Sequence, residues 1–160
     1  RFALGDFGLV DFPDNDDFTK SDRGLGAIFT IAPEMKRNPK LADASKADVF
    51  SLAKTLCMFL SGDEKGFDGV YDYLEQSHSL RYVSRFRKEH LVEIDELLKD
   101  ATNNNPDVRP DIHEFTERLL LWREIAVDFD KSQSSDWKFL TKQLFGKTCR
   151  VLPYGETLIL

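Results

Sequence analysis

Apolar residues recur at the helical spacing of three and four positions over much of this sequence. The strongest segment covers residues 46–61, where apolar side chains fall on almost every side of a helix. A helix that is apolar all round is typical of a buried core element. Gly62 is well suited to end it, because glycine readily takes the left-handed conformation just past a helix terminus. We therefore expect a buried central helix that stops at Gly62.

Other parts of the chain also carry helical signals. Residues 32–35, Ala-Pro-Glu-Met, predict a short helix with proline in an early position. Residues 103–107 form a polar turn cluster between two later periodic segments. The segments that share the spacing of about 3.6 residues are 67–74, 91–101, 112–122 and 136–145. We expect a helix over each of these segments.

The two ends of the chain differ from this helical pattern. Residues 1–10 predict two short strands around a turn, and residues 11–27 form an acidic loop. After Gly146 the pattern again becomes strand-like, around Pro153 and Gly155. The sequence therefore predicts a mainly α fold with two small strands at its front. Because the chain opens on Arg1 inside a strand-like run, we expect it to be a piece of a longer protein.

Composition and charge narrow the function classes. The chain has 160 residues, of which 41% are hydrophobic and 31% charged, a profile typical of one globular domain. A net charge of −6 without a basic tract argues against nucleic acid or an anionic membrane as a partner. No apolar run approaches the roughly 20 residues that a membrane span needs. Cys57 and Cys149 form no CxxC pair, which favours free thiols and a cytoplasmic location.

The three histidines carry no metal-site signal. They are scattered along the chain without the spacing of metal ligands, so we expect each to be a surface or helix residue. They are His78, His90 and His113.

Four short motifs occur in a set order. They are Asp6-Phe7-Gly8 after a strand, Ala32-Pro33-Glu34 after a loop, Asp48 near the start of the central helix, and residues 105–110, Asn-Pro-Asp-Val-Arg-Pro. Each is weak alone, but in this order and spacing the chain resembles the C-terminal lobe of a eukaryotic-type protein kinase. The resemblance covers residues 1–123 and begins at the DFG motif, so the N-terminal lobe would be absent. Residues 124–160 would form a tail of unknown role.

The resemblance implies a cofactor site at the start of the chain. Asp6 would bind Mg²⁺, for which carboxylate oxygen is a suitable ligand. Phe7 and Gly8 would complete the motif beside ATP, with Gly8 giving the backbone its freedom to swing. The other reading of Asp6 is the carboxylate of an ordinary Asp-containing turn. The residue that accepts the substrate proton is expected upstream, so this chain would hold no catalytic residue.

The resemblance also implies structural roles for three charged residues. Glu34 and Arg109 would form a buried ion pair that fixes the substrate-docking loop to the lobe. Asp48 would hold the backbone of the catalytic loop. The alternatives are two unrelated surface charges for the pair, and a first-turn carboxylate that complements the helix dipole for Asp48.

The loop between the DFG and Ala-Pro-Glu motifs is where kinases carry phosphorylation sites. Thr19 and Ser21 are the candidates, and the alternative is that both hydroxyls are simply solvated. The chain departs from Ser/Thr kinases at Gly26-Ala27, where they usually have Gly-Thr. It also contains no glycine-rich phosphate loop, strand lysine or His-Arg-Asp loop, which in kinases precede DFG.

The resemblance therefore implies part of an enzyme that transfers the γ-phosphate of ATP to a protein Ser/Thr hydroxyl, or less typically to Tyr. The chain alone is expected to be inactive, with a protein substrate and the missing N-terminal lobe as its partners. The alternative is a pseudokinase that binds or scaffolds, and Ala27 favours that reading. A small-molecule kinase is disfavoured by the Ala32-Pro33-Glu34 segment.

Overall fold

Helices dominate the part of the chain that the structure, a computed structural model, describes, which is residues 29–146. Of these residues 63% are helical, and no strand occurs among them, so the mainly α expectation is confirmed there. The strands predicted for residues 1–10 and after Gly146 lie outside the described range. The α-helices are α1 (Pro33–Arg37), α2 (Ala44–Ser61), α3 (Val92–Ala101), α4 (Ile112–Ala126) and α5 (Phe129–Phe145). Short 3₁₀ turns cover Leu80–Tyr82, Ser84–Phe86 and Pro106–Val108.

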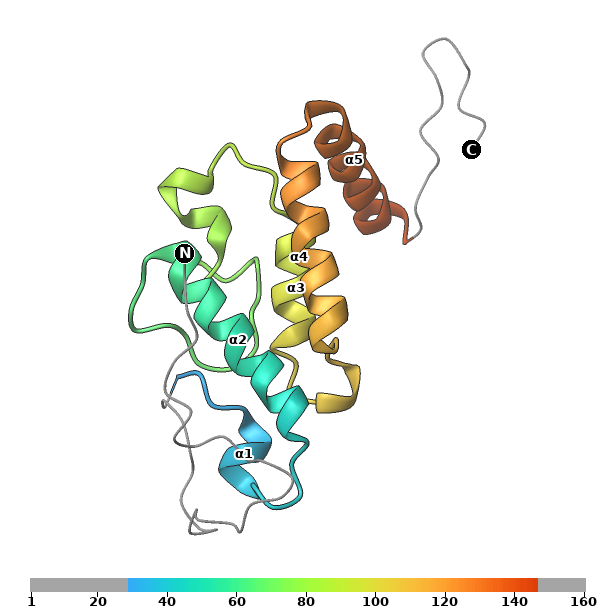
Figure 1. The fold of residues 1–160 in the computed structure, drawn as a ribbon. Helices are drawn as coiled ribbons and strands as arrows, with labels where there is room; N and C mark the ends of the chain where they lie inside the picture. Colours follow the sequence, from blue (N-terminus) through green and yellow to red (C-terminus); the bar gives the residue numbers. More distant parts are fainter. Residues whose placement is uncertain (1–28, 147–160) are drawn as a thin grey trace, which may run out of the picture.

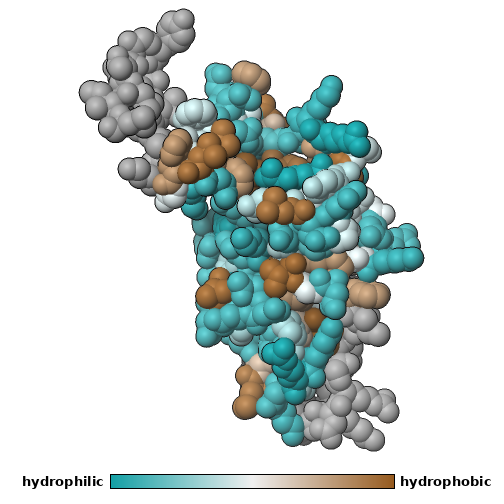
Figure 2. Space-filling view, turned by 180° about the vertical axis from the view of Figure 1, so that it is seen from behind, coloured by the Kyte–Doolittle hydropathy of each residue, from teal (hydrophilic) through white to brown (hydrophobic). Residues whose placement is uncertain are grey.

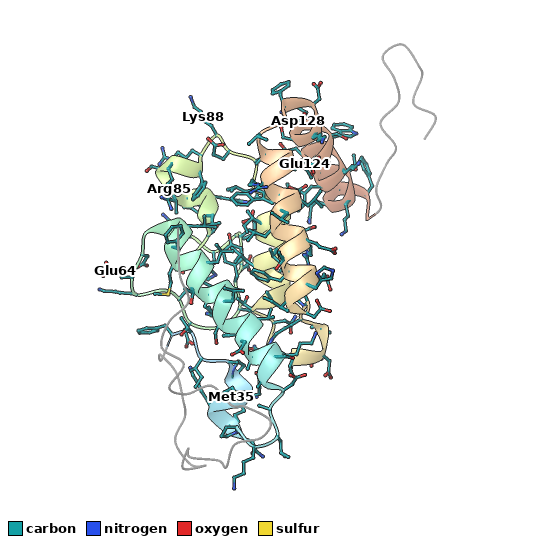
Figure 3. All side chains as sticks on the ribbon, viewed as in Figure 1. Met35, Glu64, Arg85, Lys88, Glu124 and Asp128 are labelled. Carbon is teal, nitrogen blue, oxygen red and sulfur yellow. The ribbon has the colours of Figure 1, made fainter. Side chains whose placement is uncertain are left out.

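Helix α2 is the predicted central helix, and local chemistry sets both of its ends. The Asp43 carboxylate accepts hydrogen bonds from the backbone N–H groups of Ser45 and Lys46, at 2.9 and 3.3 Å. Gly62 ends the helix with φ of 76°, in the left-handed conformation that the sequence predicted. At the same end Arg85 donates hydrogen bonds to the carbonyls of Phe59 and Leu60 (Figure 3).

The hydrophobic core lies where α2 meets α3 and α4. Helices α3 and α4 lie side by side, and α2 packs against them (Figure 1). Side chains of the cluster come from all three helices and from the loop after α2. They include Val49, Ala53, Cys57, Tyr71, Leu80, Ile94, Leu97, Leu98, Ala101 and Phe115. The predicted helical segments 91–101 and 112–122 are therefore confirmed.

One side of α2 is not covered by residues 29–146. Leu52 is 41% exposed and Phe59 is 75% exposed, although the pattern predicted a helix buried on every side. Within the described residues that expectation is wrong. The reason is that α3, α4 and the loop after α2 all pack on the same side of the helix.

Residues 67–74 do not form the predicted helix. Gly66 and Gly69 have φ values of 66° and 73°, so the chain turns twice in the left-handed region. Phe67 and Tyr71 are both buried, and their separation of four residues imitates helical spacing. Leu74, the last residue of the pattern, is exposed.

The last two described helices lie at the C-terminal end of the described residues. Helix α4 continues to Ala126, and α5 packs against α3 and α4 (Figure 1). Helix α5 is also longer than the predicted segment 136–145. Its Phe139 meets Tyr73 edge to face, with ring centroids 5.9 Å apart. Over residues 29–146 no helix has both the length and the apolar character that crossing a membrane requires.

Candidate functional site

The site residues predicted from sequence fall into two groups. Asp6, Phe7, Gly8, Thr19 and Ser21 lie outside the described residues. The structure therefore places only the second group, which consists of Glu34, Asp48 and Arg109.

Glu34 and Arg109 form a two-pronged ion pair. Nη1 of Arg109 lies 2.5 Å from Oε1 of Glu34, and Nη2 lies 2.8 Å from Oε2. The Arg109 side chain has no exposed surface, and that of Glu34 is 17% exposed. The two residues are 75 positions apart in the chain, so the pair joins α1 to the loop between α3 and α4. The contact expected between these two residues is present.

Arg109 is also bonded to the backbone of two other segments. Its Nε donates to the Asn103 carbonyl at 2.7 Å, and Nη1 donates to the Lys46 carbonyl at 3.0 Å. Lys46 returns the contact, since its ammonium donates to the Arg109 carbonyl at 2.6 Å. The guanidinium carbon lies 4.9 Å from the centre of the Phe50 ring. Arg109 therefore connects α1, the first turn of α2 and the end of α3.

The electrostatics of the pair favour an ionised Glu34. Burial raises the pKa of the Glu34 carboxyl, but the hydrogen bond and charge of Arg109, together with a backbone hydrogen bond, outweigh burial. The net result is a pKa below the ordinary value. The Glu34 carboxyl is thus ionised at neutral pH. A buried charge that loses its partner lowers the stability of the fold. Replacement of either Glu34 or Arg109 should therefore destabilise the protein.

The local sequence around Glu34 and Arg109 determines the backbone that positions each of them. Pro33 occupies the first turn of α1, where its missing N–H has no cost, and Ala32 before it is fully buried. On the other side, the side chain of Asn105 accepts from the Asp107 N–H at 3.1 Å and starts the 3₁₀ turn Pro106–Val108. Arg109 follows that turn directly and bonds Glu34 of α1.

Asp48 lies on the uncovered side of α2. Its side chain is exposed, and no hydrogen bond to it occurs among residues 29–146. Leu52 follows it after four residues and Phe59 after eleven, which places both on the same side of the helix. The structure therefore does not bring Asp48 to the Glu34–Arg109 pair. Asp48 is instead the first residue of an exposed, largely apolar stripe along α2.

Sequence analysis missed the buried ammonium of Lys54. This side chain is 2% exposed, lies 3.5 Å from the centre of the Phe67 ring, and donates to the Phe67 carbonyl at 2.7 Å. Burial lowers the pKa of Lys54 to about 8, against opposing attraction from Asp68. The only sequence signal for this buried ammonium was a lysine within the apolar segment 46–61. That segment was interpreted from its apolar residues alone.

A second missed feature is a buried polar network on α3. The Tyr71 hydroxyl donates to Oδ1 of Asp95 at 2.6 Å, and Nε of Arg81 lies 2.7 Å from Oδ2. Asp95 is only 1% exposed. Burial raises the pKa of Asp95, while the hydrogen bonds from Tyr71 and Arg81 act in the opposite direction. The network fixes the loop after α2 to α3.

The expectation for the histidines needs one correction. The imidazole of His90 is 3% exposed and lies between two carboxylates, so it is not a surface residue. Its Nε2 contacts Glu93, and its Nδ1 lies 2.9 Å from Oδ1 of Asp136 without hydrogen-bond geometry. Asp136 belongs to α5, which no sequence pattern places next to His90.

Among residues 29–146 no group of three His, Cys, Asp or Glu side chains is arranged to hold a metal ion. Asp6, the residue expected to bind Mg²⁺, lies outside that range. No protein-family model matches the chain, and no curated protein is detectably similar to it.

Proposed function

We propose that this chain is the C-terminal part of a protein-kinase-like catalytic domain. The parent protein would transfer the γ-phosphate of ATP to a hydroxyl of a protein substrate, with Ser/Thr favoured over Tyr. The observation that carries the proposal is the buried ion pair of Glu34 with Arg109. It joins the Ala-Pro-Glu segment to the Asn-Pro-Asp-Val-Arg-Pro segment, the two motifs on which the resemblance depends after DFG.

The uncovered side of α2 also supports the proposal. Asp48, Leu52 and Phe59 share this side, and a central helix seldom presents large apolar residues to water. A catalytic domain with further chain before Arg1 would cover this stripe. Asp48 would then accept hydrogen bonds from that preceding segment.

The residues would have separate roles in the intact domain. Asp6 would bind Mg²⁺, which neutralises phosphate charge during phosphoryl transfer. Phe7 and Gly8 would set the position of Asp6. Glu34 and Arg109 would hold the end of the activation segment on the helical body, and Thr19 and Ser21 would be candidate phosphorylation sites within that segment.

The second candidate is a pseudokinase that binds partners without transferring phosphate. One observation favours it, which is Ala27 at the position where Ser/Thr kinases usually have a hydroxyl. The intact Asp6-Phe7-Gly8 motif favours the enzyme instead.

The test is phosphate transfer by the parent chain, expressed with its own residues before Arg1. We expect Mg²⁺-dependent labelling of a generic protein substrate from radiolabelled ATP, and loss of labelling in Asp6→Asn. Asp16→Asn, another acidic residue of the same N-terminal region, is the matched control and should keep activity. The 160-residue chain alone should transfer nothing. A parent that binds ATP but labels no substrate would favour the pseudokinase, and a parent that does neither would contradict the proposal.

A further inference from the structure

A cavity lies between the C-terminal end of α2 and the chain that follows this helix. Its volume is about 210 Å³, and its walls come from α2, the loop after α2 and the 3₁₀ turn Leu80–Tyr82. A cavity of roughly 150 Å³ already holds benzene, so this one suits a single ring with a short side chain. On the face drawn in Figure 2, by contrast, the apolar side chains of the described residues form small separate groups on a mostly hydrophilic surface, which is ordinary for a protein.

Aromatic rings and a thioether form the apolar part of the cavity walls. Phe67 is 7% exposed and stacks on His78 with ring centroids 4.5 Å apart, so the two rings make one continuous wall. Met58 lines the cavity from α2, and Tyr82, which is 52% exposed, continues the aromatic lining toward solvent. The flexible side chain of methionine adapts to the shape of a ligand. Such walls suit a flat apolar body.

The charge of the lining is negative. Asp63 has the one carboxylate among the described residues that line the cavity, and none of those residues is Lys or Arg. Oδ1 of Asp63 accepts a hydrogen bond from the Lys65 N–H at 2.9 Å, whereas Oδ2 has no hydrogen-bond or ion-pair partner within residues 29–146. A carboxylate oxygen that is free beside an apolar cavity favours a ligand with a cationic donor.

Two other titratable residues of the lining, His78 and Cys57, add no charge at neutral pH. Nε2 of His78 accepts a hydrogen bond from the Asp72 N–H at 3.0 Å, which requires a nitrogen without a proton. Burial also lowers the pKa of this imidazole. Burial raises the pKa of the Cys57 thiol to about 12, and the charge of Asp63 makes a smaller contribution in the same direction. The lining therefore contains no cation that would repel a positively charged ligand.

We propose that this cavity binds a small arylalkylammonium ion, a molecule with one aromatic ring and a primary ammonium on a short chain. The ring would contact Phe67, His78 and Met58, and the ammonium would donate to Oδ2 of Asp63. Alkylamines are protonated at neutral pH, so this hydrogen bond joins two charged groups. The site shares no residue with those of the proposed function, so the failure of one proposal leaves the other standing.

The two methionines of the chain allow a site-specific test by NMR, because only Met58 lines the cavity. With ¹³C-methyl-labelled methionine, phenethylamine should shift the Met58 signal and saturate with a Kd of about 1 mM, as a ligand of about nine non-hydrogen atoms allows. The Met35 signal should stay in place, since Met35 packs on the separate cluster of Ala32, Ala47 and Phe50. Met58→Leu assigns the two signals.

Asp63→Asn should raise the Kd of phenethylamine roughly tenfold, because the charge-assisted hydrogen bond is lost. Glu64→Gln, which removes the next carboxylate along the chain but not one of the lining, should leave Kd unchanged. Both side chains are exposed, so both variants should fold, and circular dichroism checks this. Phenylacetate has a similar ring with a negative charge, and it should not shift Met58 at the same concentrations.

A Met58 signal that does not respond to phenethylamine would overturn the proposal. Equal shifts from phenylacetate, or an unchanged Kd in Asp63→Asn, would overturn it as well, because the carboxylate would then not select the ligand. Tighter binding of Nα-acetyl-lysine methylamide than of phenethylamine would also contradict it, since the cavity would then accept a lysine of a protein partner in place of an aromatic amine.

Discussion

Arg109 concentrates an unusual number of interactions in one side chain. Its guanidinium bonds Glu34 at two oxygens and two backbone carbonyls, and it lies over the Phe50 ring, all without exposure to solvent. A lysine could supply the charge but not the fork of donors, so Arg109→Lys should not be conservative. The stability of the whole helical body should therefore depend strongly on this position.

We expect Arg109→Ala to lower the free energy of unfolding by about 3–5 kcal/mol, because it leaves Glu34 partly buried without a partner. Arg118→Ala is the matched control. Arg118 lies 2.8 Å from Asp100 in a pair that stays partly exposed to solvent, whose loss should cost about 1 kcal/mol. Urea denaturation of the two variants measures both values. Equal losses of unfolding free energy in the two variants would show that the Glu34–Arg109 pair stabilises the fold no more than the Arg118–Asp100 pair does.

Lys54 should give the protein a distinctive response to alkaline pH. Its native pKa is about 8, below the value of roughly 10.4 in an unfolded chain. Between those two values the unfolded chain binds more protons, so the free energy of unfolding rises with pH. Below about pH 8 both states are protonated, and the full cost of burying the charge is present.

The measurement is urea denaturation of wild type and Lys54→Met at about pH 7.5 and about pH 9.5. Wild type should gain about 1–2 kcal/mol more than the variant over this interval, after allowance for solvent screening. Groups that both proteins share, including the tyrosines and Cys57, cancel in the difference. An equal change in the free energy of unfolding for the two proteins between these pH values would show that the pKa of Lys54 is not lowered.

At the scale of single residues, the sequence predicted which residues pair better than it predicted the surroundings of each side chain. The meeting of Glu34 and Arg109 was predicted from motifs, because no local pattern joins residues 75 positions apart. Lys54 was missed since its acceptor, the Phe67 carbonyl, belongs to a loop whose path depends on tertiary packing. His90 was misjudged for the same reason, because Asp136 comes from a different helix.

At the scale of elements, the glycines that follow α2 allow a matched comparison. Gly62 has φ of 76° and open space where a Cβ would lie. Gly66 has φ of 66°, and a Cβ there would lie 3.1 Å from Sδ of Met58. Both positions penalise alanine through the left-handed backbone, but only Gly66 adds a steric conflict.

We therefore expect Gly62→Ala to cost about 1 kcal/mol and Gly66→Ala about 1 kcal/mol more. Thermal or urea unfolding measures each cost. In a Met58→Ala background the two substitutions should become equal, since the side chain that conflicts with the new Cβ is shortened. A persistent difference in that background would place its cause in the backbone.

The start of α1 and the end of α2 were predicted well, whereas the surroundings of the helices were not. Gly62 and Pro33 act through their own backbone, so their effects can be read locally. Residues 67–74 carry helical spacing, yet glycine-based turns determine the path of the chain. Apolar spacing also predicted α5, but the usual assumption that apolar residues point inward is wrong for this helix. Its polar contacts with α3 were not visible in the sequence.

At the scale of the whole molecule, the described residues consist of two parts that share one hydrophobic core. Helices α3, α4 and α5 form one part, while α1 and α2 form the other (Figure 1). The core joins α2 to α3 and α4, and the Glu34–Arg109 pair joins α1 to the loop before α4. Helix α1 is only one to two turns long, so its place on the body depends on that pair and on the packing of Ala32 and Met35 against Ala47 and Phe50 of α2.

The distance along the chain between Glu34 and Arg109 has a kinetic consequence. Contacts between residues 75 positions apart require closure of a long loop, whose entropy must be lost before the contact forms. Such a contact is expected to form late, after the local helices and their nearest packing partners. A late contact affects the rate of unfolding more than the rate of folding. The ion pair would therefore act chiefly to lengthen the lifetime of the native state.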